Sequence, residues 1–127
     1  MTDLIIVQSE GPGAPSVEEG EPDPAKLIEG EYRTKTWNHY TGEDERLYCG
    51  IWESTPGKVA IENQEWEFCH FIEGAAVLTN EAGRSWTLRA GDAFIIPPGF
   101  KGTWETVEIV RKHYVILLPK TRTANAS

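Results

Sequence analysis

The chain lacks the features that would place it in a membrane or direct it across one. It contains no run of about 18 apolar residues, the length that a membrane-spanning helix needs. The apolar stretch at residues 4–7 is short and has no basic residue before it, so it lacks the pattern of a secretory leader. We therefore expect a cytoplasmic protein without membrane contacts.

Cysteine is scarce as well. Cys49 and Cys69 are the only two in 127 residues, and neither belongs to a CxxC pair of the kind that binds metal. Two thiols cannot form a disulfide framework, so we expect both to be free, as in a reducing compartment. A chain of this length forms one domain and buries roughly two thirds of its unfolded surface, which makes such cross-links unnecessary.

Basic residues are fewer than acidic ones. The chain has 12 Lys and Arg and 20 Asp and Glu, which gives a net charge of -8. Nucleic acids and anionic membranes are bound by clustered Lys and Arg, so neither is an expected partner. Much of the acidity lies in residues 10–23, which combine Gly, Pro and carboxylates. We predict a flexible acidic arm over residues 1–24, in which residues 4–7 could add a short edge strand, and a single domain over residues 25–127 with a short C-terminal tail.

Helix signals occur at one place only. Asp23 at an N-cap, Pro24 at the first helical position and Gly30 past the end predict one short helical turn. From Glu31 onward, apolar and aromatic runs alternate with turn signals roughly every eight to twelve residues, which is typical of an antiparallel sandwich or barrel. The predicted strands are residues 33–39, 47–53, 58–62, 67–73, 75–79, 85–88, 93–96, 103–107 and 108–118.

The clearest local pattern is in residues 91–102. Gly91 and Asp92 favour a tight turn, because Gly reaches positive φ and Asp bonds to nearby backbone. Residues 93–96 form an apolar run typical of a buried strand, and residues 97–99, Pro-Pro-Gly, end it. The chain must then reverse beside its neighbour. Strands arranged in this way close best as a jelly roll.

A set of spaced motifs within about residues 25–118 is typical of one protein family. The motifs are Glu67-x6-Gly74, Gly83, Gly91-x5-Pro97-x-Gly99, Gly50-Ile51-Trp52, Pro56-Gly57, Phe100-x-Gly102-Thr103-Trp104-Glu105 and Val110-Arg111-Lys112-x-Tyr114. They resemble those of the cupins, and more specifically those of the small single-domain cupins grouped with the cupin domain of (S)-ureidoglycine aminohydrolase. The resemblance implies an all-β, cupin-type double-stranded β-helix of the RmlC-like superfamily, an antiparallel jelly-roll barrel with one internal pocket that is commonly dimeric.

The metal ligands of that family are mostly missing. A metal cupin takes two His and a Glu from its first motif and a third His from its second. Here the corresponding positions are Ile61 and Asn63 (or one residue earlier), Glu67 and Gly102. The manganese ligands of the ureidoglycine aminohydrolases, a Glu, two His and a Gln, fall on the same positions. Since a catalytic metal needs three protein ligands and an open position, the resemblance implies no bound metal and no cofactor.

Side-chain alternation, together with the resemblance, predicts which residues line the pocket. Glu67 and Cys69 share one face of their strand, Lys112 and Tyr114 share one face of theirs, and the resemblance implies that both faces point into the lumen. Glu67 is either a pocket acid or base or a structural ion-pair partner. Lys112 pairs with Glu67, binds a substrate carboxylate or lies at the surface. Trp104 either occupies the emptied metal site or packs in the core.

The opposite faces are expected to lie outside the barrel. His70 differs in parity from Glu67, so we expect it to be structural or interfacial, and Arg111 and His113 should also point outward. An apolar outer face formed by Trp66, Phe68 and Ile72 suggests a buried interface and hence a homodimer.

Three functional hypotheses remain open. The first is a metal-free cupin that binds a small polar or anionic metabolite. If this protein is an enzyme, it is a small-molecule hydrolase, isomerase or epimerase in which Glu67 acts with Lys112 or Tyr114 as acid and base.

The second hypothesis is a metal-dependent, manganese-type aminohydrolase, which needs a β-bulge to bring its ligands together. Its ligands would be Glu62, Asn63, Glu67 and His70. The third hypothesis is a non-catalytic assembly or regulatory module whose lumen is plugged by Trp104 and Tyr114.

Overall fold

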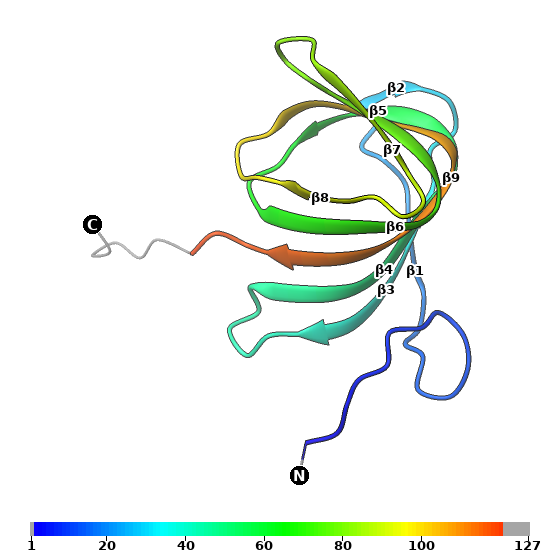
Figure 1. The fold of residues 1–127 in the computed structure, drawn as a ribbon, viewed down its shortest axis with the longest axis vertical. Coiled ribbons are helices and arrows are strands. Elements are labelled where there is room, and N and C mark those ends of the chain that lie inside the picture. The colour runs from blue at the N-terminus through cyan, green and yellow to red at the C-terminus, as the bar shows by residue number, and fades with distance from the viewer. Residues whose placement is uncertain (1, 121–127) are drawn as a thin grey trace.

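Nine antiparallel strands form one strongly curled sheet in the computed structural model, which describes residues 2–120 (Figure 1). The all-β antiparallel cupin fold is thereby confirmed. No helix occurs in the described part of the chain. The strands are β1 (Glu18–Gly20), β2 (Leu27–Glu29), β3 (Thr34–Thr41), β4 (Leu47–Ser54), β5 (Gly57–Glu62), β6 (Trp66–Asn80), β7 (Ser85–Arg89), β8 (Ala93–Ile96) and β9 (Lys101–Leu117).

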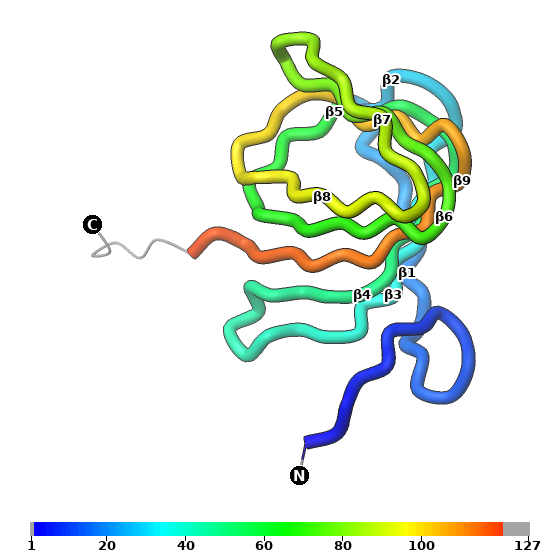
Figure 2. The backbone as a smooth tube through the Cα atoms, in the orientation of Figure 1, coloured from blue at the N-terminus to red at the C-terminus, as the bar shows by residue number. Residues whose placement is uncertain are grey.

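The long strand β9 connects the parts of this sheet. The strands follow the order β1-β3-β4-β9-β5-β2, while β6 pairs with β7, β8 and β9. The first part of β9 pairs with β5 and its second part with β4, and β6 runs along nearly its whole length. Figure 2 shows how β6 and β9 bend together around the barrel. The inner faces of these strands therefore enclose one lumen.

Two strands that were predicted to be interrupted are continuous and bent. The Glu73-Gly74 pair lies inside β6, which continues through it without reversing direction. The pairing of β6 with β9 shifts register there, between Phe71 and Ala76, so these residues form an irregularity within the strand. Gly74 has φ +89°, and a Cβ there would collide with the carbonyl of Ile109. Glycine is thus needed for a bulge that bends the sheet and not for a turn. The predicted break after residue 107 likewise lies inside β9.

The predicted helical turn at residues 23–30 forms only its first hydrogen bonds. The Asp23 carbonyl accepts from the Lys26 and Leu27 amides at 2.8 and 3.2 Å, and its carboxylate accepts from the Ala25 amide at 2.9 Å. The chain then enters β2, which pairs with β5, so the helix prediction is wrong beyond the turn. Leu27 packs against the core, and this burial outweighs local helix propensity.

The N-terminal arm contributes a strand at a different place from the one predicted. Residues 4–7 form no strand and are largely exposed, and Figure 1 shows this segment leading away from the sheet. The edge strand is β1, inside the acidic segment, where Glu18, Glu19 and Gly20 pair with β3. The acidic arm is therefore part of the sheet at its end, which places Glu18 beside the lumen.

The core lies between the curled strands and is built from inward-facing side chains. Phe71, Val110 and Cys69 are fully buried, and Leu78 and Trp104 pack with them. No helix within residues 2–120 is long and apolar enough to cross a membrane.

Candidate functional site

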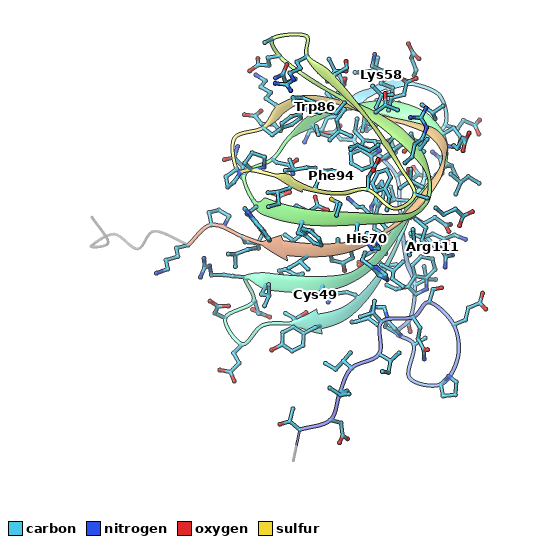
Figure 3. All side chains as sticks on the ribbon, in the orientation of Figure 1. Cys49, Lys58, His70, Trp86, Phe94 and Arg111 are labelled. Atoms are coloured by element: carbon cyan, nitrogen blue, oxygen red, sulfur yellow. The ribbon has the colours of Figure 1, made fainter. Side chains whose placement is uncertain are left out.

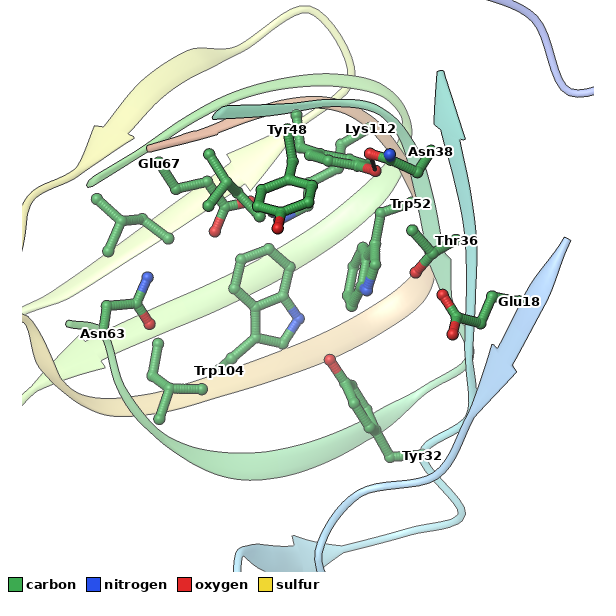
Figure 4. Close-up of a pocket in the computed structure, with 14 residues that line it drawn as sticks. Glu18, Tyr32, Thr36, Asn38, Tyr48, Trp52, Asn63, Glu67, Trp104 and Lys112 are labelled. Atoms are coloured by element: carbon green, nitrogen blue, oxygen red, sulfur yellow. Dashed lines mark hydrogen bonds and ion pairs between the residues drawn. The ribbon is translucent and has the colours of Figure 1, made fainter. Parts of the chain in front are cut away.

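A cavity of about 430 Å³ lies inside the curled sheet, and it contains both aromatic and polar side chains (Figure 4). Its existence argues against a lumen plugged by Trp104 and Tyr114, because both residues line the space without filling it. Glu18 is solvent-exposed and marks the rim. The lining residues are Glu18, Tyr32, Thr36, Asn38, Tyr48, Trp52, Ile61, Asn63, Glu67, Ile96, Trp104, Lys112, Tyr114 and Ile116.

A buried ion pair joins β6 to β9 at the wall of this cavity. The Lys112 Nζ donates to Glu67 Oε2 at 2.7 Å, and the two residues are only 5% and 8% exposed. Of the three alternatives for Lys112, the structure shows the ion pair with Glu67, and both side chains lie on the predicted inner faces of their strands. The ammonium also lies 4.6 and 4.7 Å from the ring centroids of Trp52 and Trp104, so each indole faces a cation.

The surroundings of Lys112 keep it charged. Burial alone would lower the pKa of a lysine, but Cys69 and Glu67 together raise the pKa of Lys112 above its ordinary value. Because the Cys69 thiol is uncharged at neutral pH, the carboxylate of Glu67 is the group that matters there. The positive charge of Lys112 is therefore neutralised by the Glu67 carboxylate. It is not free to bind the carboxylate of a substrate.

Of the predicted pocket residues, Tyr114 lines the cavity and Cys69 does not. Cys69 is fully buried behind the cavity wall, with its Sγ 3.4 Å from Lys112 Nζ, and burial raises the pKa of its thiol to about 12. Tyr114 lines the cavity, but its hydroxyl donates to Asn38 Oδ1 at 2.7 Å. Burial also raises the pKa of Tyr114 to about 12. Neither group is poised to transfer a proton near neutral pH.

Gly102 does not leave an empty ligand position. It pairs with Ile61 of β5 and Asn80 of β6, and a Cβ at this position would overlap the carbonyl oxygen of Thr79. The backbone of β6 thus occupies the space into which a histidine side chain would project. Trp104 lines the lumen as expected, and its indole N–H donates to Thr106 Oγ1 at 2.9 Å.

The alternative ligand set is not brought together. Asn63 and Glu67 line the cavity, whereas Glu62 is exposed and His70 lies on the opposite face of β6 (Figure 3). The β6–β9 register is unbroken from Trp66 to Phe71, so no bulge turns His70 inward. Within residues 2–120, no three His, Cys, Asp or Glu side chains cluster closely enough to hold a metal ion.

His70 forms its contacts on the outer face. Its ring stacks on that of His113 with centroids 5.6 Å apart, and the two Nδ1 atoms are 3.3 Å apart. Burial, followed by the neighbouring His70 and His39, lowers the pKa of His113. Ile72 on the same face is 40% exposed. The outward orientation of His70 and His113 is confirmed.

Several polar groups reach the lumen, and those of Trp52, Tyr32 and Glu18 were not predicted from the sequence. Trp52 Nε1, the Asn63 amide and Glu67 Oε1 line it, and none has a side-chain hydrogen bond to another described residue (Figure 4). The Tyr32 hydroxyl lines the same space. Glu67 was predicted to lie in the pocket, and Asn63 was named as a candidate ligand in the second hypothesis. Tyr32 and Glu18 precede the motifs and carry no such signal.

The buried hydroxyls and Lys112 predict a loss of stability in alkali. Burial raises the pKa of Tyr32 and Tyr114 to about 12, and that of Lys112 is also raised. In the unfolded chain these groups lose protons near pH 10, so the folded state binds more protons above that pH. The free energy of unfolding should therefore fall as the pH rises beyond about 10. Urea titrations across this range measure the slope.

The tyrosine variants provide the control for this slope. Tyr32→Phe should make the alkaline loss shallower, whereas Tyr40→Phe, at an exposed position, should leave it unchanged. An identical slope in wild type and Tyr32→Phe would contradict the role of the buried hydroxyl.

Comparison with known proteins places the chain among cupins. Residues 41–114, more than half of the chain, match the family profile described as the EutQ-like cupin domain. No match was found among curated proteins. A solved protein of unknown function from Pseudomonas syringae, assigned to the DUF861 family, is 27% identical with a TM-score of 0.74, over 83% of this chain and 46% of its own.

Two further structures share the fold. The EutQ protein of Clostridium difficile is 24% identical with a TM-score of 0.60, over 68% of this chain and 63% of its own. A putative ethanolamine utilization protein Q from Salmonella typhimurium is 19% identical with a TM-score of 0.61, over 87% of this chain and 100% of its own. The chain thus spans about half of the Pseudomonas protein and less than two thirds of the Clostridium one.

Proposed function

Because the chain belongs to the EutQ-like cupin family, we propose that its lumen binds a small polar metabolite. The observation that carries this proposal is the Asn63 side chain, which is only 8% exposed and has no side-chain hydrogen bond to any described residue. Among the described residues no buried side-chain N or O atom lacks a partner, so the Asn63 amide is open to the cavity, where a ligand or water is its natural partner. The free Oε1 of Glu67 lines the same space and adds an acceptor.

For the acid/base chemistry that the motif resemblance to the ureidoglycine aminohydrolase group implies, the lumen holds one candidate base. Among Glu67, Lys112 and Tyr114, only Glu67 keeps an atom free of protein hydrogen bonds within the described residues. Glu67 Oε1 would accept a proton from the bound substrate. The Asn63 amide would orient the substrate beside this oxygen. A hydrolase or isomerase of this kind needs a second poised group, and the Tyr32 hydroxyl, which lines the cavity, does not supply one near neutral pH, because burial raises its pKa to about 12.

A ligand screen with matched amide variants tests binding in the lumen. Small amides, amino acids and polyols would be screened by thermal shift, followed by calorimetry on the compounds that raise the melting temperature. Asn63→Leu should weaken binding of these compounds by about tenfold, since it removes one buried hydrogen-bonding group. Gln64→Leu removes an exposed amide next to it and should leave affinity unchanged. Compounds that bind both variants alike would contradict the proposal.

A further inference from the structure

The cavity has an unbalanced negative charge. Three of its lining residues are charged, namely Glu18, Glu67 and Lys112, and the last two form the buried ion pair. Two carboxylates and one ammonium leave a formal charge of minus one. Within the described residues, Glu18 makes no side-chain hydrogen bond and no ion pair, and no other Lys, Arg or His lines the space. An anionic ligand would therefore find no free cation.

The walls beside Glu18 are aromatic. Tyr32 and Trp52 lie with their ring centroids 6.4 Å apart and their planes tilted by 48°, and both line the same cavity as Glu18 and its strand partner Thr36 (Figure 4). Ring faces attract cations when water is excluded. Trp52 and Trp104 already contact the Lys112 ammonium in this way, so the rings of this lumen do stabilise a positive charge.

We infer that the lumen selects a small organic cation, a compound with an alkylammonium group. The ammonium group lies at the rim between the Glu18 carboxylate and the rings of Tyr32 and Trp52. A polar group at the other end of the compound reaches Asn63 and the free oxygen of Glu67. This inference rests on the proposed binding function and adds the charge of the ligand to it.

Three probes of nearly equal shape isolate the charge. Choline carries the cation, dimethylbutanol is its uncharged isostere with carbon in place of nitrogen, and dimethylbutyrate is an anion of similar size. Titrations of the full chain at low salt would follow the indole N–H signals by nuclear magnetic resonance. Choline should bind about tenfold more tightly than dimethylbutanol, and dimethylbutyrate more weakly than either.

Two glutamate variants on β1 locate the effect. Glu18→Gln should reduce the preference for choline over dimethylbutanol to about threefold or less, without changing the affinity for dimethylbutanol. Glu19→Gln removes the same charge at the adjacent position, which does not line the cavity, and should preserve the preference. Thermal melts check that both variants are folded.

The outcomes separate this inference from the function on which it rests. If choline and dimethylbutanol bind equally, or choline does not bind, the charge selectivity is overturned. An equal loss of choline affinity in Glu18→Gln and Glu19→Gln also overturns it, because the effect is then one of overall charge. If Asn63→Leu still weakens the compounds found in the screen, the lumen remains the binding site in each case.

Discussion

Replacing Lys112 with methionine is expected to lower the free energy of unfolding by about 3 to 5 kcal/mol, because it leaves the buried Glu67 carboxylate without its partner. The 2.7 Å contact and the exposures of 5% and 8% place both groups in a site poorly reached by water. Chemical denaturation at neutral pH measures the loss. Glu67→Leu should cost a similar amount, since the ammonium is then the unpaired group.

The double variant and a neighbouring ion pair serve as controls. Lys112→Met combined with Glu67→Leu should recover most of the loss, because no buried charge remains. The pair Arg111–Glu53, at 2.9 Å, lies one residue away on the other face of β9 and is partly exposed. Breaking it with Glu53→Gln should cost no more than about 1 kcal/mol. A Lys112→Met variant that loses no more than Glu53→Gln would refute the burial argument.

Gly102→Ala is expected to lower the free energy of unfolding by about 3 kcal/mol, the upper end of the range for overpacking. The cause is steric, because a Cβ at this position would overlap the Thr79 carbonyl oxygen, and that oxygen belongs to a paired strand that cannot move alone. Urea titration measures the effect. Gly102→His should be at least as damaging, so restoring the cupin histidine would disrupt the barrel before it could provide a ligand.

Gly83→Ala is the matched control. Gly83 has φ +88°, but no atom lies within 4 Å of the position that a Cβ would take, so alanine there meets only backbone strain of about 1 kcal/mol. Similar losses at Gly83 and Gly102 would show that crowding at Thr79 is not the cause.

Much of the sheet could be predicted because turn residues bracket its short strands. The strand at residues 93–96 lies between Gly91-Asp92 and the Pro-Pro-Gly turn, and β8 has these bounds. The predicted strand and helix boundaries were wrong where a turn-forming or capping residue has a different structural role. Gly74 bends β6 without ending it, and Asp23 caps a turn that leads into β2, because tertiary pairing and not local propensity decides both cases.

The residues of the site could be predicted only where the alternation of side chains along one strand determines which face each side chain is on. Glu67 and Lys112 meet because alternation places each on the inner face of its strand. Alternation does not measure depth, so Cys69 was expected in the pocket and lies behind its wall. Glu18 and Tyr32 reach the lumen from segments outside the motifs, and the position of Glu18 depends on the pairing of β1 with β3.

The place of β9 in the sheet has a consequence for how the chain folds. β9 pairs with β4, β5 and β6, all of which precede it in the sequence. During synthesis, the edges of these earlier strands that pair with β9 therefore remain without hydrogen-bond partners until residues 101–117 leave the ribosome. Closure depends on long-range pairing, which makes folding slow and leaves unpaired edges exposed to aggregation. We therefore expect the pairing of β9, which completes the lumen, to limit the rate of folding.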